Sequence, residues 1–565
     1  MSGVAAPATA QPAAKRSHLC LALALLFVLF RALPNISYPL GPDQATYGVI
    51  GEGLLRGQKL YRDLWDMKPP AIFWIYAGVV KLFGPVMWSV GVVDILWLLA
   101  ISGMIFVFAE RYVGTTAAVI AVVVNAAWHC RAGHNNAAQT EAFFMLFVFA
   151  AYLLVWHEGG GVSALGSHRP PLPNLLPQGL RWPLARHFVA GILLGAAFWL
   201  KYNVVVFLPF LLLVPYLDRD RLDARPFHAR LAIPWDAWRR RALALLAGVL
   251  AAVAGVLGYF WRAGLWTTLW ESHFKMLPRY GAFPLEHFSD YWTSPIFRTL
   301  GYLGFLTPLA PVVALVIARK RGELARFAPV FAGAVTGYIS VVMQVHFFPS
   351  AFEACYPFFA MAWGYLGVKA FDYFRRPDRD FAASGRRPER VCLWALIAVV
   401  GLVMLLGEGV ALAKRYGELY QWSRNPDEFY AHYPEPIPGE HLENEMRVIN
   451  LLKRESTPGA GAYVWVFYPL IYYLTGLHSP TRFVENLALR AAWSPPAWKD
   501  DLIRDLKRSP PTFIVVGRGD PARNVAFTEM DSEQYLKIFP ELNAFISDSY
   551  RAVAAFPDFV VYRRQ

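Results

Sequence analysis

Long apolar stretches constrain the fold of this chain more than any other feature. They recur through most of the first 412 residues, and several approach about 20 residues, the length that an α-helix needs to cross a bilayer. Hydrophobic residues make up 56% of the 565 residues and charged residues only 17%, whereas soluble domains carry about 25% charged residues. A soluble globule would have too few charges for its surface, and a disordered chain would be more polar. The sequence therefore predicts a polytopic α-helical membrane protein.

The apolar runs predict about eleven transmembrane helices. The first is expected at 19–33, after an Ala/Pro-rich segment, 1–18, that we interpret as a disordered cytoplasmic tail. A cleaved signal peptide is the alternative for this first run, but no small-residue cleavage motif follows it. The other runs are 88–109, 113–130, 140–156, 188–200, 202–217, 242–263, 296–318, 327–346, 352–370 and 391–412. The runs at 188–200 and 202–217 are short and could form one long helix or two.

The basic residues indicate how the chain is oriented. Arginine-rich loops at 218–241, 319–326 and 375–390 all fall on the side of the N-terminus when eleven helices are counted. Cytoplasmic loops of membrane proteins are enriched in Lys and Arg, so this side is expected to be cytoplasmic. The net charge of +13 then reflects membrane topology, and no nucleic-acid partner is predicted. We expect a multi-pass protein of the inner (plasma) membrane, embedded in its lipid bilayer.

Two segments are expected on the opposite, extracytoplasmic side. One is the long loop 34–87, which contains a short apolar stretch, 71–84, after two prolines that favours an interfacial helix. The other is 413–565, which is more polar than the transmembrane region 19–412. It contains strand-like segments at 463–468, 512–517 and 550–564 and helical patterns at 440–455 and 497–508. These patterns predict a C-terminal extracytoplasmic α/β domain.

The loop 34–87 is rich in ionisable residues, and loops of this length are usually functional. Asp43 follows Gly41 and Pro42 and precedes a helical pattern over 44–56. An aspartate in this position is a good helix N-cap. A structural capping role and a catalytic role for Asp43 therefore both remain open at this point.

The order of residues in this loop resembles the first periplasmic loop of the GT-C glycosyltransferases. The residues that carry the resemblance are Asp43, Tyr47, Gly57, Tyr61, Asp63, Lys68-Pro69-Pro70 and Leu82-Phe83-Gly84. More narrowly, they resemble the bacterial group of families 39 and 83. That group includes relatives of protein O-mannosyltransferases, aminoarabinose transferases and rhizobial-type galacturonosyltransferases. Aminoarabinose transferases often have Glu before Lys-Pro-Pro, where this chain has Met67.

The resemblance extends over residues 20 to 520. Its further segments are Arg131-x-x-His134-Asn135-Asn136, Thr140-Glu141, Gly191-x-x-x-Gly195 before Lys201, Gln344-x-His346, and Tyr463-x-Trp465. Where others have Asp, this chain has Glu141.

The resemblance implies an activity. A sugar carried on a polyprenyl phosphate would be transferred, with inversion, to a hydroxyl of a cell-envelope acceptor: a lipid, a glycan or a protein. Asp43 is the expected catalytic base. The leaving lipid phosphate needs cations, for which Lys68, Lys201 and Arg131 are the candidates. Substrate contacts are expected from Glu141, Tyr47, Asn135 and His346. The residue spacing predicts no metal site, although the reaction would be compatible with a divalent cation.

A transporter or flippase of lipid-linked sugars is the alternative function. Transporters usually show internal repeats and helices broken by Pro, Gly or charges near the bilayer centre. No internal repeat is visible here, and Asp94 is the one acidic residue within the run 88–109. The long first loop and the polar C-terminal part favour an enzyme.

Overall fold

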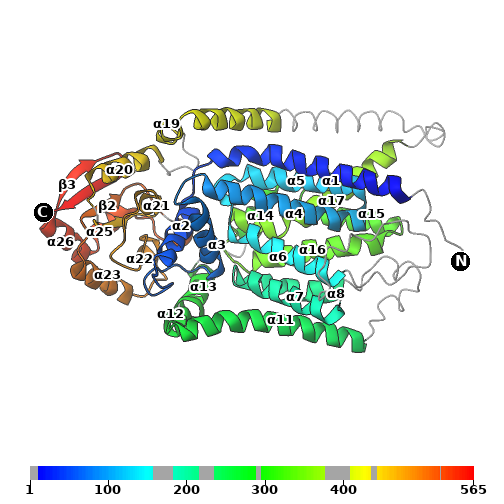
Figure 1. Ribbon diagram of the computed structural model, residues 1–565, viewed down its shortest axis with the longest axis horizontal. Helices are drawn as coiled ribbons and strands as arrows, with labels where there is room; N and C mark the ends of the chain where they lie inside the picture. The colour runs from blue at the N-terminus through cyan, green and yellow to red at the C-terminus, as the bar shows by residue number, and fades with distance from the viewer. Residues whose placement is uncertain are drawn as a thin grey trace, which may run out of the picture.

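The computed structural model describes residues 10–156, 182–214, 235–287, 294–375, 407–433, 442–457, 459–521 and 523–565. A bundle of roughly parallel helices fills one end of the molecule, and a small β-sheet with short helices lies at the other end (Figure 1). Helices α2 (Pro42–Leu55) and α3 (Ala71–Phe83) lie between these two parts. The first loop, 34–87, therefore lies at the junction between the helix bundle and the C-terminal part of the molecule.

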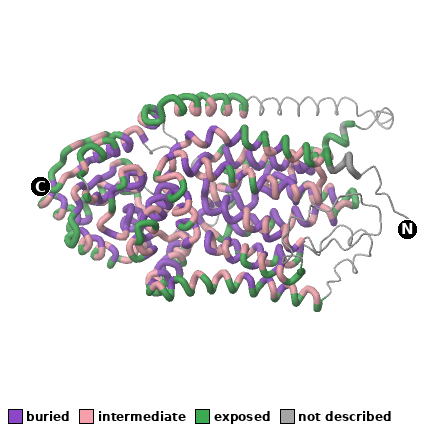
Figure 2. Tube along the Cα trace, in the orientation of Figure 1, coloured by how far each residue is buried: buried purple, intermediate pink, exposed green. Residues whose placement is uncertain are grey.

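The helices of the bundle follow the apolar runs closely. They are α1 (Ala10–Ala32), α4 (Ser89–Val113), α5 (Thr115–Arg131), α6 (Thr140–Trp156), α7 (Pro183–Phe198), α8 (Phe207–Leu213), α11 (Trp235–Arg262), α14 (Ser294–Leu303), α15 (Ala310–Lys320), α16 (Leu324–Val342) and α17 (Tyr356–Arg375). Buried residues gather where helices face one another, whereas α11 is largely exposed along its outer side (Figure 2). Apolar side chains such as those of Leu246 and Leu250 are exposed on α11, as expected for a helix surface that faces lipid. The helix also satisfies its backbone hydrogen bonds internally, which a lipid environment requires.

Four helical stretches of the described chain are long and apolar enough to cross a membrane. They are Lys15–Ser37, Ser89–Val113, Trp235–Arg262 and Leu324–Val342. Shorter apolar helices, such as α6 and α7, pack beside them. The count of about eleven spans stays a prediction, and the run 391–412 lies mostly outside the described residues.

Two of the expected helix boundaries differ in the structure, and one open alternative is decided. Helix α1 begins at Ala10, so residues 10–18, which we expected to be disordered, are helical. The run 296–318 forms two helices, because Gly304 adopts a φ of 72° between them and Pro311 lies in the first turn of the second. The runs 188–200 and 202–217 also form separate helices, α7 and α8, and Lys201 lies in extended backbone at the break.

Glycines permit the close packing of α7 against α11. A Cβ atom on Gly191 would collide with the backbone carbonyl of Leu245, and one on Gly248 would collide with that of Phe188. Small residues at such crossings let helix backbones approach closely. Gly191 and Gly195 therefore serve the packing of α7, the helix that ends just before Lys201.

The segment after α11 turns back over the junction. It comprises α12 (Trp266–Trp270), a π-helical turn η6 (Glu271–Met276) and α13 (Leu277–His287). Later in the chain, the 3-10 helix η8 (Pro349–Ala354) joins α16 to α17. Both segments contribute buried side chains to the junction.

The C-terminal part contains a four-stranded sheet in the order β1-β2-β4-β3. Strand β1 (Ala462–Trp465) pairs in parallel with β2 (Phe513–Gly517), and β4 (Phe559–Arg564) pairs antiparallel with both β2 and β3 (Tyr550–Ala555). The helices of this part are α19 (Pro426–Ala431), α20 (Leu442–Glu455), α21 (Leu470–Thr475), α22 (Leu487–Arg490), α23 (Ala497–Arg508), α24 (Arg523–Ala526), α25 (Ser532–Lys537) and α26 (Pro540–Ser549). The structure confirms the strand-like segments predicted within 463–468, 512–517 and 550–564. It also confirms the helices predicted at 440–455 and 497–508.

The orientation of the C-terminal part in the membrane is open to a direct measurement. We expect a fusion of alkaline phosphatase after residue 420 to be active and a fusion of green fluorescent protein there to be dark, because the Arg-rich loops favour the opposite side. The measurement is the paired reporter assay in intact cells, with fusions in the loop 319–326 as the reciprocal control. A fluorescent, phosphatase-negative fusion after residue 420 would contradict the orientation.

Candidate active site

Asp43 lies in the first turn of α2 with its carboxylate partly open to solvent. The N-cap of this helix is Gly41, Pro42 occupies its first turn, and no side chain caps it. The capping role that the sequence left open for Asp43 is therefore wrong. Its Oδ2 lies 3.9 Å from Nζ of Lys68, and the side chains of Asp43 and Lys68 are 44% and 25% exposed. The structure thus pairs the predicted base with a predicted phosphate ligand.

A second acid–base pair lies deeper. Glu141, in the first turn of α6, is 1% exposed and forms an ion pair with Lys201, which is 20% exposed. The other carboxylate oxygen of Glu141 accepts a hydrogen bond of 2.5 Å from the hydroxyl of Thr140. Because a buried carboxylate is costly without partners, these two contacts explain how Glu141 is accommodated inside the molecule.

The two pairs act electrostatically as one cluster. Lys68 interacts with Asp43, Asp66 and Glu141. Lys201 interacts with Glu141, Asp43 and Lys68. Two lysines that the sequence places 133 residues apart therefore converge on the same carboxylates, as expected for groups that serve a common ligand.

Asp66 is the member of this cluster that sequence reasoning missed. Its Oδ1 accepts a hydrogen bond of 2.7 Å from the backbone N–H of Lys68, which fixes the turn before Pro69. Burial raises the pKa of Asp66 to about 6, although nearby Lys68 opposes the shift. Burial alone would lower the pKa of Lys68, but Asp43, Asp66 and Glu141 raise it above its ordinary value. Asp66 lies two residues before the Lys-Pro-Pro motif, and this position is the sequence feature that could have identified it.

The raised pKa of Asp66 makes the stability of the folded protein depend on pH. The pKa of Asp66 is about 6 in the folded protein, against 3.8 for an unperturbed aspartate, so its stabilisation is present below the lower value and lost as pH rises through 6. Asp66→Asn keeps the acceptor for the Lys68 N–H. We therefore expect it to stabilise the protein at pH 8 by about 2 to 3 kcal/mol and to have no effect near pH 4. Melting temperatures in detergent across this pH range measure the effect. An equal effect at both pH values would contradict it.

The remaining predicted residues are distributed unevenly around the cluster. His346 is buried, stacks on Tyr280 with ring centroids 4.1 Å apart, and lies within electrostatic range of both Lys68 and Lys201. Arg131 is exposed at the end of α5, and Asn135 lies in a short 3-10 turn. In the part of the chain that the structure describes, no contact joins Arg131 or Asn135 to the cluster. Their predicted substrate contacts stay predictions.

Tyr47 is a core residue of α2. It is fully buried and makes edge contacts with the rings of Phe73 and Tyr76 on α3. Its hydroxyl has no hydrogen-bond partner among the described residues, and it lies within electrostatic range of Asp43 and Glu141. The structure places Tyr47 behind the cluster, where it helps to hold α2 against α3.

The π-helical turn η6 covers one side of the junction. Its Ser272 accepts a hydrogen bond of 3.1 Å from the indole of Trp65. Its His273 packs edge-on against Tyr61, with ring centroids 4.8 Å apart, and against Tyr202, which follows Lys201. Tyr61 in turn donates a hydrogen bond of 2.8 Å to the carbonyl of Lys68. These aromatic contacts position the backbone on which both lysines stand.

The C-terminal part also contacts the first loop. The N–H of Trp65 donates to the carbonyl of Arg482 at 2.8 Å, and the Trp65 ring contacts Phe483 and Trp498. Nearby, Glu485 lies within electrostatic range of Asp66, and burial raises the pKa of Glu485 to about 8. The C-terminal part therefore completes the wall behind Asp66.

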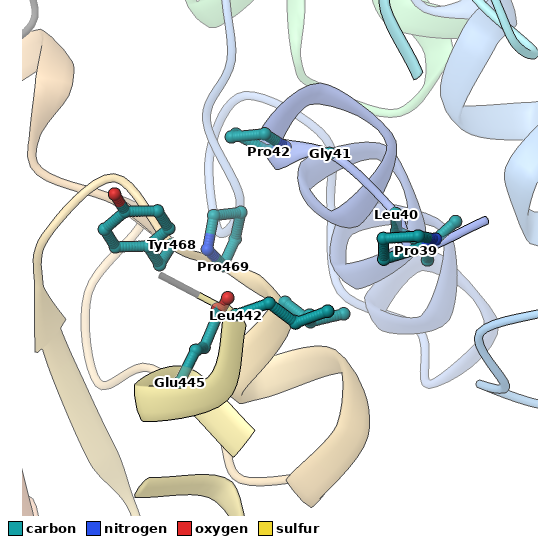
Figure 3. Close-up of a pocket in the computed structure, with 9 residues that line it drawn as sticks. Pro39, Leu40, Gly41, Pro42, Leu442, Glu445, Tyr468 and Pro469 are labelled. Carbon is teal, nitrogen blue, oxygen red and sulfur yellow. The ribbon is translucent and has the colours of Figure 1, made fainter. Parts of the chain in front are cut away.

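A small cleft lies beside the start of α2. Residues 39–42 form one wall, and Glu445 of α20 and the segment 468–470 form the other (Figure 3). Its volume of about 20 Å³ is room for about one water molecule. The cleft is too small for a sugar.

No group of three or more His, Cys, Asp or Glu within the described ranges is arranged to hold a metal ion. His273 and His346 are packed against aromatic rings.

Known proteins share this architecture. Residues 67–157 match the family model described as dolichyl-phosphate-mannose-protein mannosyltransferase. That segment includes Lys68 and Glu141 but not Asp43 or Lys201. A comparison with curated protein sequences finds no match.

Solved structures match over most of the chain. The crystal structure of ArnT from Cupriavidus metallidurans bound to undecaprenyl phosphate has a TM-score of 0.54 at 15% identity and covers 96% of this chain and 97% of its own. Its apo structure has a TM-score of 0.53, again at 15% identity, and covers 98% of each chain. The Archaeoglobus fulgidus oligosaccharyltransferase tethered to an acceptor peptide matches at a TM-score of 0.44 and 14% identity, over 89% of this chain and 69% of its own. The two ArnT matches show that the chain has the GT-C fold, as the sequence resemblance implied.

Proposed function

We propose that this protein is a membrane glycosyltransferase that transfers a sugar from a polyprenyl phosphate to a hydroxyl of a cell-envelope acceptor. The observation that carries the proposal is the partly exposed Asp43 carboxylate, 3.9 Å from the Lys68 ammonium and within electrostatic range of the Lys201–Glu141 pair. The ArnT structure with undecaprenyl phosphate supports a lipid-linked donor. We place the reaction on the extracytoplasmic face, where the basic loops predict the first loop to lie.

The base in this reaction is Asp43. Its carboxylate accepts the proton of the acceptor hydroxyl while the hydroxyl oxygen attacks the anomeric carbon. The bond between that carbon and the phosphate oxygen breaks, and polyprenyl phosphate leaves with the electron pair. Attack from the face opposite the leaving group inverts the anomeric configuration, as in inverting glycoside hydrolysis. A carboxylate that is 44% exposed is accessible to an incoming hydroxyl.

The lysines stabilise the leaving group. Negative charge grows on the lipid phosphate as the bond breaks, and ammonium groups already oriented toward it lower the barrier. Lys68 is surrounded by Asp43, Asp66 and Glu141. A phosphate that draws Lys68 toward itself also frees Asp43 to act as a base. We expect protonation of Asp66 to accompany donor binding, because it removes one of the competing negative charges.

The test is a transfer assay with the purified full-length protein in detergent or nanodiscs. A panel of radiolabelled polyprenyl-phosphate sugars is supplied with envelope extract, and mass spectrometry identifies the acceptor. Transfer that depends on Asp43 and releases polyprenyl phosphate is the expected result. Movement of the labelled lipid across a vesicle membrane without any transfer would overturn the proposal in favour of a flippase.

A further inference from the structure

A second cluster of ionisable side chains is buried within the helix bundle, outside the candidate active site. His129 of α5 stands between Asp94 of α4 and Glu353 of η8. Its Nδ1 lies 2.8 Å from Oε1 of Glu353, and its Nε2 lies 3.1 Å and 3.2 Å from the two oxygens of Asp94. All three side chains are nearly inaccessible to solvent. Such groups are expensive inside a membrane protein and usually mark a functional requirement.

The hydrogen bonds of this triad are mutually dependent. Each ring nitrogen of His129 faces a carboxylate, so both nitrogens must carry a hydrogen if both carboxylates are ionised. The imidazolium then donates to Asp94 on one side and to Glu353 on the other. Removing His129 leaves two buried carboxylates without a partner, and removing either carboxylate leaves one nitrogen of the buried His129 without its acceptor, which is costly. The triad therefore joins α4, α5 and η8 as a unit.

Asp94 also holds the loop between α5 and α6. Its Oδ1 accepts a hydrogen bond of 2.7 Å from the backbone N–H of Ala138. Ala138 has a φ of 50°, a conformation that a residue with a Cβ atom adopts only when its surroundings enforce it. The carbonyl of Ala138 accepts a hydrogen bond of 3.1 Å from Tyr76, and that of Ala137 accepts one of 2.9 Å from Gln44. The loop is thus tied to α2, α3 and α4.

The hydrogen bonds of the triad and of the loop connect to two parts of the candidate active site. Gln44 is the neighbour of Asp43 on α2, and Thr140 and Glu141 follow the loop directly. At the other end of the triad, Glu353 belongs to η8, which follows the segment that carries His346. The triad therefore fixes the loop connections on which Asp43, Glu141 and His346 depend.

We propose that Asp94, His129 and Glu353 are positioning residues that set the separation between Asp43 and Glu141 by anchoring the loop 132–139. This inference rests on the proposed glycosyl transfer for its activity readout. It predicts that breaking the triad slows the chemical step and leaves donor affinity nearly unchanged, because no triad member lies against the lysine pair in the described contacts.

The experiment compares three substitutions on α4 in the purified full-length protein. Asp94→Ala removes the acceptor for the Ala138 N–H. Asp94→Asn keeps that acceptor, and its amide donates to a neutral His129 that donates in turn to Glu353. Tyr112→Phe is the matched control, because Tyr112 lies on the same helix as Asp94. The substitution removes the buried hydrogen bond between the hydroxyls of Tyr112 and Tyr152 and leaves the loop 132–139 unchanged. The readouts are kcat, KM for the lipid-linked donor, and hydrogen–deuterium exchange of the amides in 132–142.

Asp94→Ala is expected to lower kcat by about 10²-fold, with donor KM within about threefold, since misplacement of a reacting group by about 1 Å has this effect. Exchange of the loop amides should rise about tenfold. Asp94→Asn should restore both readouts to within about threefold of the wild type, and Tyr112→Phe should change neither. If Asp94→Ala does not accumulate, His129→Gln, which reaches only one carboxylate, should show the same pattern.

Normal turnover despite faster exchange would overturn the positioning role, and so would an Asp94→Asn protein as slow as Asp94→Ala. Absence of transfer in the wild type would instead count against the glycosyltransferase assignment. The exchange measurement would still test the anchoring: loop amides equally protected in Asp94→Ala and wild type would overturn it.

Discussion

Asp43→Asn is expected to lower turnover by about 10² to 10⁴-fold, the usual effect of removing a general base. The substitution keeps the size and shape of the side chain. It also leaves the helix start intact, because Gly41 is the N-cap and the Asp43 side chain makes no capping bond. The measurement is kcat with a saturating lipid-linked donor, together with the melting temperature.

The melting temperature should stay within a few degrees of the wild type, since an exposed ion pair such as Asp43–Lys68 contributes only about 0 to 1 kcal/mol. Asp63→Asn is a suitable control, because Asp63 lies in the same loop and pairs with the exposed Arg62. Near-normal turnover of Asp43→Asn would rule out Asp43 as the base. Glu141 would then be the next carboxylate to test.

Lys201→Met is expected to affect both stability and activity. It leaves the buried Glu141 without its cation, and breaking a buried pair costs about 3 to 5 kcal/mol. We expect the lower end of that range because Lys201 is 20% exposed. Loss of a phosphate ligand should also raise the donor KM or lower turnover by about tenfold or more. Thermal unfolding and steady-state kinetics measure the two effects separately.

A double substitution separates these two roles of Lys201. Lys201→Met with Glu141→Gln removes both charges, so stability should recover while transfer stays impaired. Lys68→Met is the matched comparison, because its ion-pair partner Asp43 is partly exposed. Its loss should impair transfer and lower the melting temperature less than Lys201→Met does, although Asp66 and Glu141 also lose a nearby cation. Recovery of full activity in the double variant would show that Lys201 serves Glu141 alone.

The sequence predicted most helices of the bundle because apolar runs are local signals, whereas the orientation that the loop charges indicate stays a prediction. The strands at 462–465, 513–517 and 550–564 were also predictable, since they alternate with turn residues. Boundaries set by single residues were harder. Gly304 and Pro311 split one predicted span, and no average over an apolar run detects such a break.

The site was predictable as a set of residues but not as a geometry. The motif order indicated Asp43, Lys68, Glu141 and Lys201, and the structure brings these four together. Tyr47, one turn along α2 from Asp43, is fully buried, and spacing along a helix does not specify which of its side chains are buried. His129 joins residues 35 and 224 positions away in the chain, and a single sequence carries no sign of such long-range pairing.

The strand order of the C-terminal sheet has a consequence for biosynthesis. Strand β4 lies between β2 and β3, so the sheet cannot be completed until residues 559–564 have emerged from the ribosome. Trp65, next to Asp66 in the first loop, docks on the segment around Phe483, which belongs to this same part of the molecule. Asp43 and Lys68 are therefore synthesised long before the C-terminal residues that pack behind Asp66. Assembly of this wall is therefore expected to be a late event in folding.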